Sequence, residues 1–349
     1  MYTRELSAPR NTPIENGIPV QGTWTKAFKD VDLLAVQWPY RFPLPRSLLD
    51  ARIKEWESFI IQGDRFFMEA LLINVKLFCM AQVFLYDRET REKHKYLKVI
   101  PFGGWKLPRG LYNSAVDSHS MGFFFRVHSW LDANTVRVDL DIAARARNPA
   151  FTAHLMYNLR RKKTCPLVVN LGFSERRCVY AYKTLAAVRG AVIIGGKRII
   201  LNPSRTSGFF FDFKGFYPYP MQSVWCTASG FDGAGRRVGF TLAENQTRES
   251  RRNNENALWV DGELSPLPAV RITMPAGIAS EWVIQDVEGM VDLVFTPLEQ
   301  LRSSYNVILS RADLESPLGY YNGMVMSAQG EQIQIHNLFG TGEKLFLRV

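Results

Sequence analysis

Turn-forming residues return along most of this chain at intervals of roughly 8 to 15 residues, from about residue 65 to the C-terminus. The segments between them are short, and some alternate strictly between apolar and charged side chains, as in TVRVDLD at residues 135–141. Such alternation is typical of a half-buried antiparallel strand, because successive side chains point to opposite faces of a sheet. The spacing therefore predicts a series of hairpins and meanders.

Glycine pairs and polar centres mark several of these hairpins. Residues 123–142 contain two apolar runs around the polar triplet DAN. In residues 191–201, Gly195 and Gly196 separate two β-branched runs. Glycine adopts the positive φ angles that a two-residue hairpin turn requires, so a tight hairpin is expected there and not a phosphate-binding loop.

Helix is expected only near the N-terminus. Residues 47–59 are the best candidate, with Ser47 as a possible N-cap, but the same stretch could equally begin the first strand. Aromatic residues make up 13% of the chain, which favours strands and large apolar contact surfaces. We therefore predict an all-β protein with little helix.

The predicted strands are too many for one sheet, since open twisted sheets rarely exceed about ten strands. Two tandem antiparallel β-barrel or β-sandwich modules are the natural arrangement. The least strand-like zone, residues 144–166, is the candidate crossover. The predicted division is an N-terminal extension with a possible short helix at 1–55, a first β-barrel-like module at 56–175 and a second at 176–349.

The net charge and the basic clusters indicate which kinds of partner the protein can bind. The formal net charge is +10, with basic clusters at 160–163 and 248–252 that are expected to be loops. This balance favours encounters with phosphates, anionic lipid surfaces or acidic small molecules. No zinc-finger, recognition-helix or aromatic RNA-binding signature is present, so nucleic acid is not expected as a partner.

Cysteine and histidine usage bear on location and metals. The four cysteines are scattered without a CxxC pair, and Cys79 and Cys226 lie in apolar runs that indicate buried thiols. We expect a soluble protein of the reducing cytoplasm, because the polar N-terminus has no signal-peptide pattern and no apolar run is long enough to span a membrane. The five histidines have no metal-type spacing, so no metal site is expected.

The stretch GFFFDFKGFYPYPMQSVW, residues 208–225, holds eight aromatic side chains in eighteen positions, with Asp212 as its sole carboxylate. In an apolar pocket a carboxyl group is shifted toward its neutral form and becomes a general acid usable near pH 7. Aromatic faces could stabilise a developing cation. The candidate catalytic residues are Asp212, Tyr217 and Tyr219.

Further polar groups follow within about fifty residues. We expect the substrate-binding groups to be Trp225, Phe211, Phe213, Glu244, Asn245, Glu255 and Asn256. The structural alternative is a large aromatic core in which Asp212 caps the turn of DFKG. In either case Asp232 and Asp261 are assigned to Asp-Gly turns.

From about Lys54 to the C-terminus, the sequence resembles the bacterial family of domain of unknown function 2804. The stretches that carry the resemblance include YDRET, YKTLAAVRGAVI, FDFKGFYPYPMQSVWCTASG, NENALWVDGEL and GTGEKLF. The family motif D-x-x-G-x-x-P-Y falls on Asp212, Gly215, Pro218 and Tyr219, and its Glu-Asn pair on residues 255–256. Thr227 stands where the family is expected to have a second aromatic residue.

The chain is also distantly similar to a lipocalin-like group that contains carotenoid 1,2-hydratases, AttH-like proteins and fungal Diels–Alderases. That similarity implies two lipocalin-like barrel modules with an apolar pocket in or between them. An acidic residue near Trp and Tyr acts in the hydratases, and Asp212 is assigned that role by analogy.

Together these observations lead to one leading hypothesis and two alternatives. The leading hypothesis is an enzyme without metal or organic cofactor, which acts on an isoprenoid- or polyene-like molecule by acid-initiated hydration, isomerisation or cyclisation. The first alternative is a non-catalytic carrier of a lipid or other hydrophobic ligand whose basic surface contacts anionic membranes. The second is a carbohydrate-active enzyme, which requires paired carboxylates facing one cleft.

Overall fold

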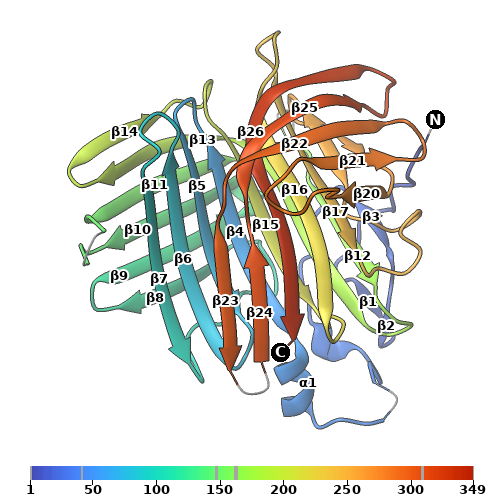
Figure 1. Cartoon of the computed structure of the whole chain (residues 1–349). Coiled ribbons are helices and arrows are strands. Elements are labelled where there is room, and N and C mark those ends of the chain that lie inside the picture. The colour runs from blue at the N-terminus through green and yellow to red at the C-terminus, as the bar shows by residue number, and fades with distance from the viewer. Residues whose placement is uncertain (1, 41, 146–147, 161–163, 308–309, 349) are drawn as a thin grey trace.

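Two strongly curved antiparallel sheets form the body of the protein (Figure 1). The computed structural model describes residues 2–40, 42–145, 148–160, 164–307 and 310–348. Within these ranges the helices are α1 (Arg46–Arg52) and the short 3-10 turns η1 (Leu33–Ala35) and η2 (Leu131–Ala133). The predicted all-β fold with two barrel-like modules is confirmed.

The first sheet contains 13 strands in the described residues. Its main path is β7 (Lys93–Pro101), β6 (Phe78–Asp87), β5 (Phe66–Asn74), β4 (Lys54–Gln62), β15 (Ser207–Gly215), β13 (Cys178–Ile194), β11 (Phe151–Asn158), β10 (Thr135–Ile142), β9 (Phe123–Trp130) and β8 (Ser114–Ser120). Beside this path lie β12 (Leu167–Gly172), β14 (Lys197–Leu201) and β3 (Gly22–Trp24), and a separate ribbon pairs β1 (Ile14–Glu15) with β2 (Ile18–Pro19).

The second sheet contains 11 strands in the same ranges. Its main path is β19 (Glu263–Pro266), β18 (Ala257–Val260), β17 (Arg237–Asn245), β16 (Met221–Phe231), β26 (Gln332–Arg348), β25 (Leu318–Met326), β22 (Val291–Glu299), β21 (Trp282–Asp286) and β20 (Val270–Thr273). The hairpin of β23 (Arg302–Val307) and β24 (Ser310–Glu315) adds to the end of β26. It lies beside β6 and β7 of the first sheet in Figure 1, where Lys95 donates a hydrogen bond to Ser303.

The chain passes from the first sheet to the second between Gly215 and Met221. The expected module boundary at 175/176 therefore falls inside the first sheet, because β13, β14 and β15 pair with strands of that sheet. Residues 144–166 are not a plain crossover, since they contain β11, which pairs with β10 and β13. On its outer face His154 is exposed, whereas the apolar Met156 is half-buried and obscured the alternation of this strand. The division into separate domains stays a prediction.

The predicted hairpin turns have the expected backbone. Gly195 and Gly196 have φ angles of 54° and 83° and join β13 to β14. The segment 47–59 contains both of its predicted structures, since α1 ends at Arg52 and β4 begins at Lys54. Ser47 does not cap the helix, because the N-cap residue is Pro45 and no side chain bonds the first turn.

Apolar cores fill the inside of each curved sheet, and a third core lies between the sheets. β15 contributes to two of them. Phe210 packs inside the first sheet, whereas Phe209, Phe211 and Phe213 belong to the core between the sheets. All nine residues of β15 are buried, so this strand has protein on both faces.

Three of the four cysteines are buried, and the fourth, Cys165, is half-buried. Cys79 and Cys226 are buried, as predicted, and neither forms a disulfide. Among the described ranges, no helix combines the length and apolar character that crossing a membrane requires. Residues 161–163 of the basic cluster at 160–163 lie outside the described residues.

Replacing Gly190 with Ala tests the close contact that anchors β13. Gly190 has a φ angle of 140°, and a Cβ atom there would lie 1.9 Å from the carbonyl oxygen of His154. Because that oxygen is backbone and cannot move cheaply, we expect a loss of about 2 kcal/mol or more in the free energy of unfolding, measured by denaturant titration. Gly103→Ala is the control, since a Cβ there meets nothing within 4 Å. Equal stability of the two variants would contradict this packing.

Candidate functional site

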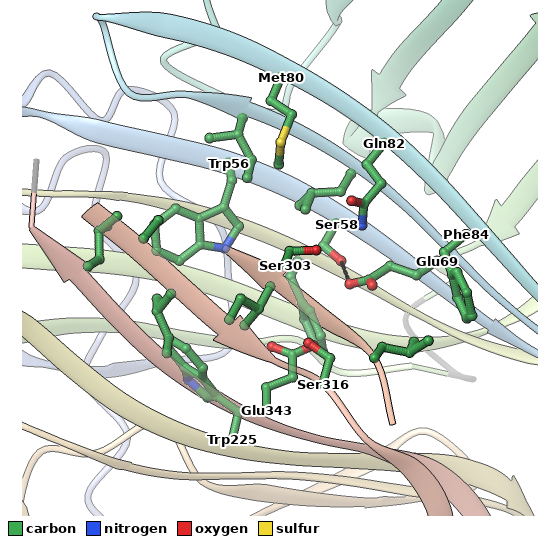
Figure 2. A pocket seen from close by; sticks show the side chains of 18 of the residues that line it. Trp56, Ser58, Glu69, Met80, Gln82, Phe84, Trp225, Ser303, Ser316 and Glu343 are labelled. Atoms are coloured by element: carbon green, nitrogen blue, oxygen red, sulfur yellow. Dashed lines mark hydrogen bonds between the residues drawn. The ribbon is translucent and has the colours of Figure 1, made fainter. Parts of the chain in front are cut away.

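A cavity of about 420 Å³ lies between the two sheets, and Figure 2 shows the side chains that line it. The first sheet contributes residues from β4, β5, β6 and β15 to its wall. The second sheet contributes residues from β16, β24 and β26. Ligand cavities of this size are common in enzymes and carriers of small molecules.

The wall is mainly apolar because alternate residues of each strand face inward. On β4 these are Trp56, Ser58 and Ile60, and on β15 they are Phe211 and Phe213. Phe213 is paired with Trp56 across the two strands, and their rings stack with centroids 5.0 Å apart. The period of two residues therefore produces a continuous aromatic surface on one side of the cavity.

Two carboxyl groups enter the cavity from opposite walls. Glu69 comes from β5 and accepts a hydrogen bond from Ser58 Oγ at 3.3 Å. Glu343 comes from β26, and Figure 2 shows it close to Ser316 and facing the part of the cavity where Ser58 and Glu69 meet. Among the described residues, neither glutamate forms an ion pair with a Lys or Arg side chain.

The surroundings favour the neutral forms of both acids. Burial, together with the negative charge of Glu69, raises the pKa of Glu343 to about 8, although Lys183 acts in the opposite direction. Burial also raises the pKa of Glu69, while the hydrogen bond from Ser58 and the charge of Lys95 oppose the shift. Glu343 therefore keeps its proton at neutral pH and can act as a general acid.

A network of buried polar side chains holds the indole of Trp225 at the cavity wall. Lys183 Nζ pairs with Glu255 Oε2 at 2.7 Å, and both side chains are almost fully buried. Asn245 Nδ2 donates to Glu255 Oε1 at 2.7 Å, and Trp225 Nε1 donates to the same oxygen at 3.4 Å. The structure thus brings three predicted residues, Trp225, Asn245 and Glu255, into one network beside the cavity.

Asp212 lies on the opposite face of β15 from the cavity. It pairs with Lys214, and it is opposite Glu57 in the register of β15 and β4. The side chain of Asp212 is 1% exposed, and burial raises its pKa although Lys214 acts against the shift. Burial and the charge of Asp212 raise the pKa of Glu57 to about 8. Asp212 is therefore part of a buried charge cluster inside the first sheet.

The remaining predicted residues have different positions. Tyr217 is buried and stacks on Trp56 with centroids 5.0 Å apart, behind the cavity wall. Tyr219 is 54% exposed. Glu244 pairs with Arg271, and it also accepts a hydrogen bond from the backbone of β20.

Asn256 has a structural position as well. Its side chain accepts from the Ala243 backbone N–H at 2.7 Å and donates to the Pro268 carbonyl at 2.8 Å, which fixes the loop before β18. Of the predicted set, Phe211, Phe213 and Trp225 line the cavity directly. The functional roles assigned to all ten residues stay predictions.

Glu69 and Glu343 were not among the predicted site residues. Both had a signal in the sequence, since Glu69 is the one charge in the strand FFMEALLIN, and Glu343 lies in the stretch GTGEKLF. A strand that is apolar on both faces is buried on both sides, so a single acid in it must be buried as well. Among the described residues, no group of three or more His, Cys, Asp or Glu side chains is arranged to hold a metal ion.

Removing Lys214 tests the buried charge cluster. Lys214→Met leaves Asp212 and Glu57 buried without their cation, so we expect a loss of about 3–5 kcal/mol in the free energy of unfolding. The loss should be larger at pH 8 than at pH 5, because the two carboxyl groups can take up protons at the lower pH. Denaturant titration at both values measures it, with the exposed Lys197→Met as control. A loss independent of pH would count against shared charge in this cluster.

Replacing Glu343 with Gln tests its raised pKa without a substrate. Between an unfolded pKa near 4.5 and a folded pKa of about 8, only the folded protein keeps this proton, so stability falls as pH rises. The slope for one proton is at most about 1.4 kcal/mol per pH unit. Glu343→Gln should flatten this dependence and be more stable than the native protein above pH 7. An unchanged slope, matching the exposed Glu288→Gln control, would refute the raised pKa.

Comparisons with known proteins agree with this fold. The crystal structure of CghA with Sch210972 is 11% identical and superimposes with a TM-score of 0.55, over 86% of this chain and 89% of that chain. Kievitone hydratase from Nectria haematococca is 13% identical with a TM-score of 0.54, over 84% of this chain and 88% of that chain. At these identities the likeness establishes the fold alone.

Sequence comparisons give the family. No curated protein shows significant sequence similarity to the chain. The family model described as domain of unknown function (DUF2804) matches residues 3–348, which is nearly the whole chain. The chain therefore belongs to the DUF2804 family.

Proposed function

We propose that the protein is an enzyme that performs acid–base chemistry on a largely apolar small molecule bound between its two sheets. The reaction class is hydration, isomerisation or cyclisation. The observation that carries the proposal is the pair of carboxyl groups, Glu69 and Glu343, in an otherwise mainly apolar cavity. A carboxyl group that remains protonated at neutral pH in such a site is a general acid with little competing water.

The surroundings of the two acids assign their roles. Burial raises the pKa of Glu69, but the hydrogen bond from Ser58 and the charge of Lys95 oppose that rise, so we assign Glu69 as the base of the pair. Glu343 is disfavoured as an anion by burial and by Glu69, so it is the acid. When two acids interact in this way, loss of the first proton makes loss of the second harder.

The structural relatives support the reaction class only in general terms. One is named kievitone hydratase, and CghA was crystallised with Sch210972. The first name is that of an enzyme that acts on a small molecule. Their low identity to this chain carries no residue over, so the roles of Glu69 and Glu343 rest on the geometry and electrostatics of this cavity.

The carbohydrate alternative shares one feature with this site, since it also requires two carboxylates facing one cleft. The apolar lining argues against it. Much of the wall offers no hydrogen bonds to the hydroxyl groups of a sugar, since it consists of apolar side chains such as Leu71, Ile73, Met80, Leu345 and Leu347. Burying those hydroxyls without partners costs about 1–3 kcal/mol each. The carrier alternative predicts binding without turnover, and contact with anionic membranes stays a prediction.

The proposal is tested by solvent deuterium incorporation. The protein is incubated in D₂O with an apolar metabolite extract of its source cells, and mass spectrometry follows compounds that gain deuterium or water. We expect incorporation that decreases as pH rises through about 8, because Glu343 then loses its proton. Glu343→Gln should lower the rate by about 100-fold or more, and Glu288→Gln should not.

The variant Asp212→Asn decides whether the general acid is Asp212 or Glu343. If Asp212→Asn removes incorporation without lowering the melting temperature, and Glu343→Gln does not, the acid is Asp212, as first predicted from the sequence. If no compound changes in any extract while ligands co-purify, the protein is a carrier and the enzymatic proposal fails.

A further inference from the structure

Apart from Lys54, whose ammonium donates to the backbone carbonyls of Ala51 and Val75, the cavity is polar at one end and apolar at the other. In the first sheet, the row Trp56, Ile73 and Met80 runs across β4, β5 and β6, and every side chain in it is apolar. The next row toward the other end contains Ser58 and Gln82, and Glu69 follows in the row after that.

The second sheet has the same gradient. Leu347 lies opposite Ala312, and Leu345 lies opposite Leu314, so this part of the wall is apolar. Further along β26 comes Glu343, which Figure 2 shows near Ser316. Figure 2 shows Glu343 and Ser316 across the cavity from Ser58 and Glu69, so the polar parts of the two sheets face each other at the same end of the cavity.

The charges at the polar end select the kind of head group. An anionic head would meet two glutamates there. Of the cations that line this end of the cavity, Lys183 pairs with Glu255 and Arg302 pairs with Glu315 at 3.7 Å. Lys95 donates to Ser303 at 2.7 Å and acts on the charge of Glu69. A neutral head group fits this end of the cavity if it accepts a hydrogen bond from the acid Glu343 and gives up a proton to the base Glu69.

The presence of two carboxyl groups narrows the class further. Protonation of an isolated alkene uses an acid alone, whereas this cavity holds two carboxyl groups at one end, so one can donate a proton while the other accepts one. Donation to a carbonyl oxygen fits this arrangement, because the oxygen gains charge only as a neighbouring C–H bond is broken by the base.

We propose that the substrate is an amphipathic, neutral carbonyl compound with a conjugated or enolisable head between Glu69 and Glu343 and an apolar tail along the Trp56 and Leu345 end. This inference rests on the proposed function and names its substrate class. In the isomerisation, Glu69 takes a proton from carbon next to the conjugated system while Glu343 gives its proton to the carbonyl oxygen. The resulting dienol returns that proton to Glu343, and Glu69 delivers its proton to a different carbon, so no co-reactant is needed.

Matched probes test the head group by binding alone. Dodecadienone, dodecadienoate and dodecadiene have the same chain and differ in the head. Binding is followed by quenching of the tryptophans, since Trp56 and Trp225 line the cavity. We expect the dienone to bind about tenfold more tightly than either of the others. Dienoate or diene binding as tight as dienone binding would overturn the inference.

The absorption band of the dienone gives an independent readout. Hydrogen bonding from Glu343 should shift the band to longer wavelength, and this shift should disappear as pH rises through about 8. Glu343→Gln should abolish the pH dependence, and Glu288→Gln should retain it. A band that is unshifted, or shifted equally in all three proteins at every pH, would overturn the inference.

The two proposals can fail separately. If the dienone binds with the pH-dependent shift but deuterium never enters carbon, the head group is correct and the enzymatic function is wrong. If deuterium enters a hydrocarbon substrate in the metabolite extract while the dienone shows no shift, the function stands and the carbonyl head group is wrong.

Discussion

The burial of β15 on both faces is the constraint on which the rest of the molecule depends. Phe209, Phe211 and Phe213 pack between the sheets, while Phe210 and Asp212 point inside the first sheet. One strand therefore connects two cores, and the cavity exists because its aromatic face does not contact the second sheet along its whole length. A polar residue on either face of such a strand has no access to bulk water, which explains why every charge near it has a partner or a shifted pKa.

The buried charges are arranged as two groups on opposite sides of this strand. Inside the first sheet, Lys214 compensates Asp212 and Glu57. On the cavity side, Lys183 compensates Glu255, whereas Glu69 and Glu343 have no ion pair of that kind among the described residues. Buried ion pairs contribute little net stability but are costly to break. Glu69 and Glu343 thus have shifted pKa values without an ion pair, and groups with shifted pKa values cluster at functional sites.

Much of the fold could be predicted because turns and alternation are local properties. The hairpin at Gly195 and Gly196 and the strand at residues 135–141 have the predicted structure, since their patterns depend only on neighbouring residues. The point near residue 215 where the chain passes from the first sheet to the second was not predicted. The predicted boundary at 175/176 falls just before β13, a strand of 17 residues that pairs with four strands of the first sheet, and nothing in its own sequence shows which sheet it joins. The candidate site was predicted in part: Phe211, Phe213 and Trp225 line the cavity, but Asp212 faces away from it.

The sequence by itself determined that this is an all-β chain, which segments form hairpins and that the stretch near residue 212 forms either an aromatic core or an apolar pocket. Asp212, Phe211 and Phe213 were predicted to belong to one site, but within the strand β15 Asp212 points to the face opposite its two neighbours. Only the tertiary structure decided which face borders the cavity, because both faces of β15 are buried and hydrophobicity cannot distinguish them. It also brought Glu69 and Glu343 together over a separation of more than 270 residues, through packing of two sheets that no local pattern encodes.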